Sequence, residues 1–86
     1  MSYKVKRSSN AGSEDEILSF PTEEAANQTI EDELDEVKAM LVAQCKDYDY
    51  GEFFYEDGLT TEIWVPGEDF YTSWTRLWTK GDEFHD

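Results

Sequence analysis

Two spacings of apolar residues divide the chain into a helical middle and strand-forming flanks. From Thr22 onward, apolar residues recur at steps of three and four, the period of an amphipathic helix. This stripe comprises Ala26, Ile30, Leu34, Val37, Leu41 and Cys45. Thr22 is a suitable N-cap, and Glu23 and Glu24 fall in the first turn, where carboxylates are favourable. With Lys46 in the last turn, the pattern predicts a helix over residues 22–46, about 37 Å long.

Before the helix, apolar and polar residues alternate as they do in strands. The turn-forming cluster from Asn10 to Ser13 separates residues 3–9 from the segment EDEILSF. A hairpin closed on that cluster gives the cross-strand pairs Val5–Leu18, Tyr3–Phe20, Arg7–Glu16 and Ser8–Asp15. Apolar residues then meet apolar ones and opposite charges meet, which favours this hairpin over a loose basic tail at the N-terminus.

After the helix, a segment rich in β-forming residues is interrupted by Asp57-Gly58, a strong hairpin signal. We expect strands at about residues 52–56 and 59–65, with Pro66-Gly67 ending the second. A two-residue turn at Asp57-Gly58 gives the pairs Glu52–Ile63 and Glu56–Leu59. That register sets apolar residues opposite charged ones and places both kinds on the same face.

The last segment, residues 68–80, fits two structures. Phe70, Trp74, Leu77 and Trp78 have helical spacing, with acids before them and Lys80-Gly81 after them. Threonine and the aromatic residues nevertheless prefer strands, and Trp74, Arg76 and Trp78 share a face at period two. The agreement of caps and stripe predicts a short C-terminal helix, and a strand is the alternative.

These elements predict a single small α+β domain over residues 1–86. Its order is ββαββα, or ββαβββ with a final strand, and an antiparallel sheet packs on one long helix. A chain of 86 residues has no room for a second core, so the five Phe, five Tyr and three Trp must supply much of the buried area. We expect the first few residues and the polar tail 82–86 to be frayed.

Charge restricts the partners of this chain. It carries 21 acidic and 7 basic residues, a net charge of −14, which opposes direct binding to nucleic acid or anionic membranes and favours basic proteins. Cys45 is the only cysteine, so no internal disulfide forms and a reducing cytosol is the expected location. No apolar run approaches the roughly 18 residues of a membrane span. The predicted location is cytoplasmic, in the host cell if a phage encodes the protein.

Catalytic, metal and cofactor signatures are missing from the sequence. His85, the only histidine, is next to last in a polar tail, and Cys45 lies on the apolar stripe as an expected core residue. The segment from Asp47 to Gly58 departs from a calcium-binding loop at its fifth, sixth and twelfth positions. We therefore predict that the protein is not an enzyme and holds neither a metal nor a cofactor.

Like charges crowd the middle of the predicted helix, where Glu31, Asp32, Glu33, Asp35 and Glu36 place five carboxylates in six positions. Repulsion at i, i+3 and i, i+4 spacing costs about 1–2 kcal/mol in total at low salt. A helix that began at Thr29 would place some of these acids in a favourable first turn. A protein from a high-salt organism would have the repulsion screened. Neither alternative explains why aromatic residues alternate with acids between residues 47 and 57.

Acids beside aromatic residues indicate a surface that binds another protein. Neighbouring residues on a strand point to opposite sides, so some of these rings must be exposed beside carboxylates, as at a protein-binding hot spot. The predicted partner-binding residues are Glu31, Asp32, Glu33, Asp35, Glu36, Asp47, Asp49, Tyr50, Glu52, Tyr55, Glu56 and Asp57.

Five carboxylates in six helical positions approach the charge density of a nucleic-acid duplex, which has one phosphate per ~1.7 Å. Short, acidic, aromatic and poor in cysteine, the chain resembles the DNA-mimic, anti-restriction and anti-CRISPR proteins of bacteriophages. That resemblance implies an inhibitor occupying the basic nucleic-acid-binding surface of a partner, such as a nuclease complex. The alternatives are an immunity protein or antitoxin that plugs a nuclease, and a non-inhibitory virion, scaffold or salt-adapted interaction domain.

Overall fold

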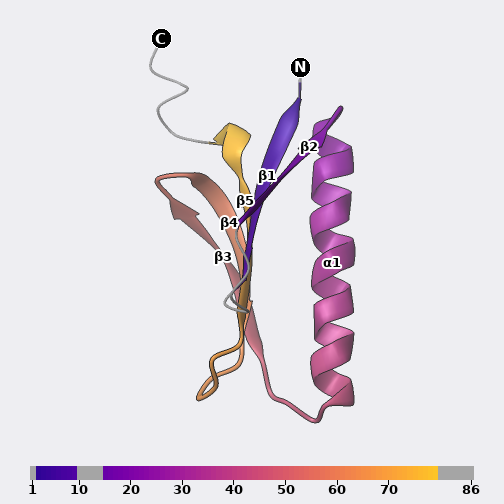
Figure 1. Ribbon diagram of the computed structural model, residues 1–86, viewed down its shortest axis with the longest axis vertical. Helices are drawn as coiled ribbons and strands as arrows, with labels where there is room; N and C mark the ends of the chain where they lie inside the picture. The colour runs from indigo at the N-terminus through magenta and orange to yellow at the C-terminus, as the bar shows by residue number, and fades with distance from the viewer. Residues whose placement is uncertain (1, 10–14, 80–86) are drawn as a thin grey trace.

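A five-stranded antiparallel sheet with one long helix across it forms the described part of the chain (Figure 1). This computed structural model describes residues 2–9 and 15–79. In chain order, the elements are β1 (Tyr3–Ser9), β2 (Glu16–Phe20), α1 (Glu23–Ala43), β3 (Asp49–Tyr55), β4 (Gly58–Trp64), β5 (Tyr71–Arg76) and the 3-10 helix η1 (Leu77–Thr79). The strands lie side by side in the order β2-β1-β5-β4-β3. The α+β class predicted from the sequence is confirmed.

The N-terminal hairpin has the predicted register. β1 and β2 pair antiparallel, with Val5 opposite Leu18 and Arg7 opposite Glu16. The hydroxyl of Ser8 donates a hydrogen bond of 2.6 Å to Asp15, as the alignment of these two residues requires. The predicted turn over residues 10–13 lies outside the described residues, as does the tail 82–86.

Helix α1 is capped where predicted and ends three residues early. The backbone amide of Ala25 donates to the hydroxyl of Thr22 at 3.1 Å, which satisfies one of the free amides of the first turn. At the other end, Cys45 has a left-handed φ of 57°, and the amide of Lys46 donates to the carbonyl of Leu41 at 2.9 Å. The expectation that Cys45 is a core residue is wrong. It is exposed, because this left-handed turn takes it off the apolar stripe.

The β3–β4 hairpin turns one residue earlier than predicted. Its two-residue loop is Glu56-Asp57, and Gly58 is the first residue of β4 with a φ of +131°. The predicted register is therefore wrong: Tyr50 lies opposite Ile63, and Phe54 opposite Leu59. These pairs join apolar with apolar residues, and Glu52 lies opposite Thr61 instead of Ile63. Gly58 is required here because a Cβ atom would lie 2.3 Å from a backbone oxygen of the neighbouring chain segment.

The predicted C-terminal helix is wrong, and the alternative strand is correct. Residues 71–76 form β5, which occupies the centre of the sheet between β1 and β4. Hydrogen bonding to strands on both sides and burial of Trp74 at 1 % exposure outweigh the helical spacing. Only Leu77–Thr79 turn helically, as a single 3-10 turn.

The two faces of the sheet differ in character. On the face covered by α1, Val5, Ile63 and Trp74 pack with the helix stripe into one core. Side chains alternate along each strand, so their neighbours point to the opposite, uncovered face. There the buried residues of β4 and β5 are polar: Thr60, Glu62, Ser73 and Thr75. The fold therefore offers an edge strand, an outer helix face and a polar sheet face for function.

Candidate functional site

Edge strand β3 exposes four aromatic side chains. Tyr50 is 55 % exposed, Phe53 41 %, Phe54 61 % and Tyr55 49 %. By the alternation of the strand, Tyr50 and Phe54 lie on the α1 side of the sheet, and Phe53 and Tyr55 lie on the other. A seven-residue edge strand with large exposed rings on both faces is unusual for an unpartnered surface.

Carboxylates surround these rings. Asp49 lies on β3 and Glu56 in the hairpin loop, and both are exposed. Glu52 reaches the guanidinium of Arg76 at 3.6 Å, and Asp57 pairs with Lys6 at 2.8 Å. We call β3 with its loop, residues 49–57, the edge surface. It brings together six of the predicted partner-binding residues: Asp49, Tyr50, Glu52, Tyr55, Glu56 and Asp57. Asp47 is exposed in the connection that precedes β3.

A second acidic surface lies on the outer side of α1. Glu31, Asp32, Asp35 and Glu36 are all exposed, with Glu36 at the border toward the sheet, and we call them the helix surface. The alternative start at Thr29 is wrong, because α1 begins at Glu23. These acids therefore lie in mid-helix, where no free amides offset their mutual repulsion.

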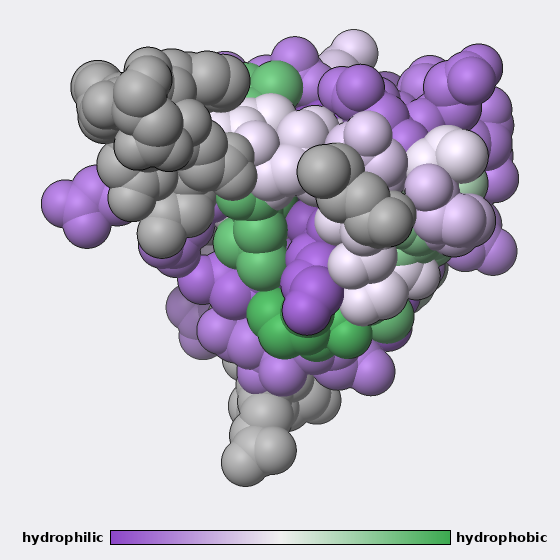
Figure 2. Space-filling model, turned by 90° about the horizontal axis from the view of Figure 1, so that it is seen from above, coloured by the Kyte–Doolittle hydropathy of each residue, from purple (hydrophilic) through white to green (hydrophobic). Residues whose placement is uncertain are grey.

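The two surfaces lie on different sides of the molecule. Figure 1 shows the outer side of α1 turned away from the sheet, whereas β3 forms the far edge of the sheet. They approach each other where β3 begins, since the ammonium of Lys38 on α1 lies 3.8 Å from the ring centre of Tyr50. Seen from the end at which α1 begins, the outline of the molecule is mostly hydrophilic (Figure 2).

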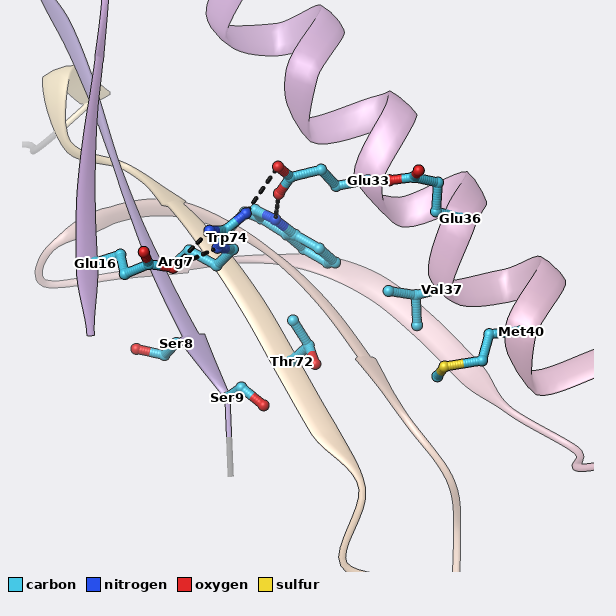
Figure 3. A pocket seen from close by; sticks show the side chains of 10 residues that line it. All are labelled: Arg7, Ser8, Ser9, Glu16, Glu33, Glu36, Val37, Met40, Thr72 and Trp74. Carbon is cyan, nitrogen blue, oxygen red and sulfur yellow. Dashed lines mark hydrogen bonds and ion pairs between the residues drawn. The ribbon is translucent and has the colours of Figure 1, made fainter. Parts of the chain in front are cut away.

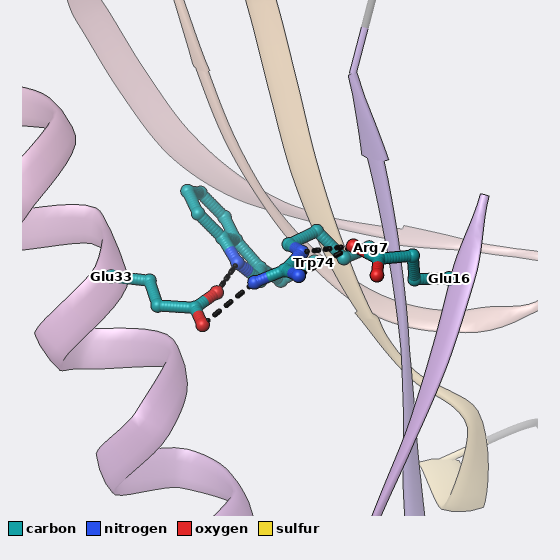
Figure 4. A network of polar contacts seen from close by, with 4 residues as sticks. All are labelled: Arg7, Glu16, Glu33 and Trp74. Atoms are coloured by element: carbon teal, nitrogen blue, oxygen red, sulfur yellow. Dashed lines mark hydrogen bonds and ion pairs between the residues drawn. The ribbon is translucent and has the colours of Figure 1, made fainter. Parts of the chain in front are cut away.

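Glu33 belongs to neither surface, although the sequence placed it among the partner-binding acids. Its carboxylate accepts a hydrogen bond from the indole nitrogen of Trp74 at 2.7 Å and one from Arg7 at 2.8 Å (Figure 4). Arg7 also pairs with Glu16 on β2. Hydrogen bonds to Glu16 and then to Glu33 raise the pKa of Arg7 above its ordinary value. This network joins α1, β1, β2 and β5, so Glu33 fastens the helix to the sheet.

A hollow of about 400 Å³ adjoins this network between α1 and the sheet (Figure 3). Glu33, Glu36, Val37 and Met40 line it from the helix, facing Trp74 and its neighbours on the sheet. Arg7 points into the hollow and is already paired with two carboxylates. Because Arg7 is already paired in this way, we assign the hollow a structural role.

We expect Glu33→Ala to lower the free energy of unfolding by about 1–3 kcal/mol, because the buried indole of Trp74 and the half-buried guanidinium of Arg7 lose their acceptor. Glu36→Ala is the matched control, three residues further along the same helix, and should change stability by less than about 0.5 kcal/mol. Urea unfolding monitored by circular dichroism measures both values. Equal effects of the two substitutions would contradict the role assigned to Glu33.

The uncovered face of the sheet carries a polar trough of about 270 Å³. Its lining is rich in hydroxyl groups, from Ser8, Tyr55, Thr60, Tyr71, Ser73 and Thr75. The Lys6–Asp57 ion pair spans from β1 to the hairpin loop at the border of the trough. Glu62 also lines it and is only 9 % exposed.

Two tyrosines hold the carboxylate of Glu62. The phenol of Tyr71 donates to it at 2.8 Å, and the phenol of Tyr55 also bonds to it. Burial, followed by this hydrogen bond, raises the pKa of Tyr71 to about 12. The bond to Glu62 is the main cause that raises the pKa of Tyr55. Both phenols are therefore neutral donors at physiological pH.

Glu62 and Tyr71 are not among the residues predicted from the sequence to bind a partner. Glu62 lies on β4 between Thr61 and Ile63, opposite Gly51 on β3. Its burial on the uncovered face of the sheet could be inferred only with the correct strand register. Tyr71 lay in the segment assigned to a helix. The trough depends on strand pairs that are distant in sequence.

Neither a metal site nor a membrane-spanning helix is found in the part of the chain that the structure describes. No group of three or more His, Cys, Asp or Glu residues within 2–9 and 15–79 is placed to hold a metal ion. In the same residues, no helix has both the length and the apolar character needed to cross a membrane. No protein-family model matches the chain, and neither a curated protein nor a solved structure matches it.

Proposed function

We propose that the protein is an acidic inhibitor that binds the basic nucleic-acid-binding surface of a partner protein, in the manner of a DNA mimic. The partner class is a nuclease or another nucleic-acid-binding complex, as in phage defence against restriction or CRISPR systems. We place this activity in the cytoplasm of the host cell, where a single unpaired thiol is stable.

The edge surface is the observation that carries the proposal. Phe54 and Tyr50 are more than half exposed on a strand that also carries Asp49 and Glu52. Large rings inside a charged rim are typical of binding hot spots, where the ring supplies affinity and the rim orients the partner. A negative rim selects a basic partner.

The helix surface supports the same partner class. Its four carboxylates repel one another in mid-helix, and this repulsion lowers stability unless a partner supplies the counter-charge. Between residues 31 and 36, the carboxylates of α1 recur at a spacing similar to that of phosphates along a duplex. Because it carries no exposed ring, the helix surface serves to steer the partner.

Steering and anchoring predict different kinetic effects on a captured partner. Neutralising the helix surface (E31Q, D32N, D35N and E36Q together) should slow association about tenfold at low salt and slightly stabilise the fold. Phe54→Ala should instead accelerate dissociation about tenfold or more, because an exposed ring that anchors the partner is lost. Surface plasmon resonance with a partner captured from bacterial lysate measures both rates.

The control is the double variant Glu24→Gln and Asp69→Asn. Its change in association rate is compared with that of the helix-surface variant after division by the number of charges removed. Both side chains are exposed, and they lie outside the helix and edge surfaces. If association slows equally in this control, the effect of the helix surface is one of net charge alone and not of a specific steering site. Unchanged rates in all variants would refute the proposed function.

A further inference from the structure

Glu62 is a buried anion that forms no ion pair within residues 2–9 and 15–79, and the lysine that shares its trough, Lys6, pairs with Asp57 instead. It is 9 % exposed, and none of the ion pairs among the described residues includes it. Two phenols satisfy its oxygens but leave its charge uncompensated. Burying a carboxylate without an ion-pair partner is costly, so a cation that entered the trough would find a carboxylate whose charge no ion pair offsets.

The space beside Glu62 is open to a small group. Its cross-strand neighbours are Gly51 on β3 and Ser73 on β5. Ser73 is short, and the ring of Phe53 leans over Gly51, where a Cβ atom would lie 3.1 Å from it. The carboxylate of Glu62 therefore lines the trough together with the rings of Tyr55 and Tyr71 and the hydroxyl of Ser73.

The chemistry of the trough selects a planar cation with several donors. Apart from Lys6, which pairs with Asp57, the polar side chains that line the trough are hydroxyls and carboxylates, whose oxygens can accept hydrogen bonds. A guanidinium has five donors in a fixed plane, no acceptor, and a face that stacks on aromatic rings such as that of Tyr55. An ammonium has three donors around a point charge and matches this geometry less well.

We propose that the trough binds the guanidinium group of an arginine from the partner protein. The identity of the donor rests on the proposed function, because a basic nucleic-acid-binding surface is rich in arginine. Tyr55 belongs to both the edge surface and the trough. A partner docked on β3 can therefore insert an arginine beside it to pair with Glu62.

A small probe tests this site without the partner. N-acetyl-arginine amide, titrated into the isotope-labelled protein, should shift the NMR signals of Glu62, Tyr71 and Ser73. N-acetyl-citrulline amide, which has the same shape without the charge, should not shift them. Glu62→Gln should weaken arginine binding about tenfold or more. Glu56→Gln removes one charge from the nearby loop and should weaken it by no more than about twofold.

Ser73→Val is a second variant, which fills the trough while leaving the carboxylate in place. A valine suits a central strand, so this variant tests the site even if Glu62→Gln does not fold. It should abolish the arginine shifts. Equal binding of arginine and citrulline, or unchanged binding in Ser73→Val, would overturn the guanidinium site. Neither result would affect the proposed binding of a basic partner to the edge and helix surfaces, so failure of the arginine site is distinguishable from failure of the proposed function.

Discussion

Replacing Trp74 with Ala should lower the free energy of unfolding by about 3–5 kcal/mol. Trp74 is 1 % exposed on the central strand and is the largest fully buried side chain. Its removal leaves a cavity between β5 and α1 and takes away the indole donor that holds Glu33 at 2.7 Å. A domain of this size holds only about 5–10 kcal/mol, so this variant should be partly unfolded at 37 °C.

Phe54→Ala is the matched control, since it also truncates an aromatic ring on the same sheet. Phe54 is 61 % exposed, so the change should alter stability by no more than about 0.5 kcal/mol. Trp74→Phe should fall between the two, because it keeps most of the packing and loses the indole hydrogen bond. A similar loss in Phe54→Ala and Trp74→Ala would contradict the assignment of Trp74 to the buried core and of Phe54 to the exposed edge.

Gly58→Ala should destabilise the fold by about 2–4 kcal/mol, the second largest effect. Two penalties add at this position. The φ of +131° is rarely adopted by residues with a side chain, and the new Cβ would lie 2.3 Å from the backbone oxygen of Arg76. Because that oxygen belongs to the end of β5, the hairpin and the central strand must separate to make room.

Gly67→Ala separates the two penalties. Gly67 also has a positive φ, +83°, but no atom lies within 4 Å of an added Cβ. It should therefore lose only about 1–2 kcal/mol, the conformational part. Urea unfolding of both variants measures the difference. If both lose the same amount, the close approach of β4 to the end of β5 plays no part in stability.

Local patterns predicted the N-terminal hairpin and the long helix. In the hairpin, the register that joins Val5 with Leu18 also joins Arg7 with Glu16, so packing and charge agree. In the helix, the cap at Thr22 agrees with the apolar stripe. Both elements involve residues close in sequence, and each is specified by more than one signal.

The error at β5 has a simple cause. Phe70, Trp74 and Trp78 are separated by steps of four, and such steps lie on one face of a helix and equally on one face of a strand. Within the apolar stripe, only Leu77 distinguishes a helix from a strand, and it lies in the 3-10 turn. Pairing with β1, more than sixty positions away in the chain, decides between the two structures.

The candidate site was predictable in part. The acids and rings of the edge surface follow from alternation along one strand, which needs no tertiary information. Glu33 could have been separated from its neighbours, because at 100° per residue it lies closer to the buried Ile30 than Asp32 or Asp35 does. The trough could not have been predicted, since Glu62 and Lys6 come together only through the order of the strands.

Competition with duplex DNA tests the central claim most directly. The captured partner is held at fixed concentration, and its affinity for the protein is measured with and without duplex at two salt concentrations. We expect the duplex to displace the protein and the dissociation constant to rise steeply with salt, because both ligands use the same basic surface. An affinity indifferent both to the duplex and to salt would show that carboxylates on these surfaces do not replace phosphate.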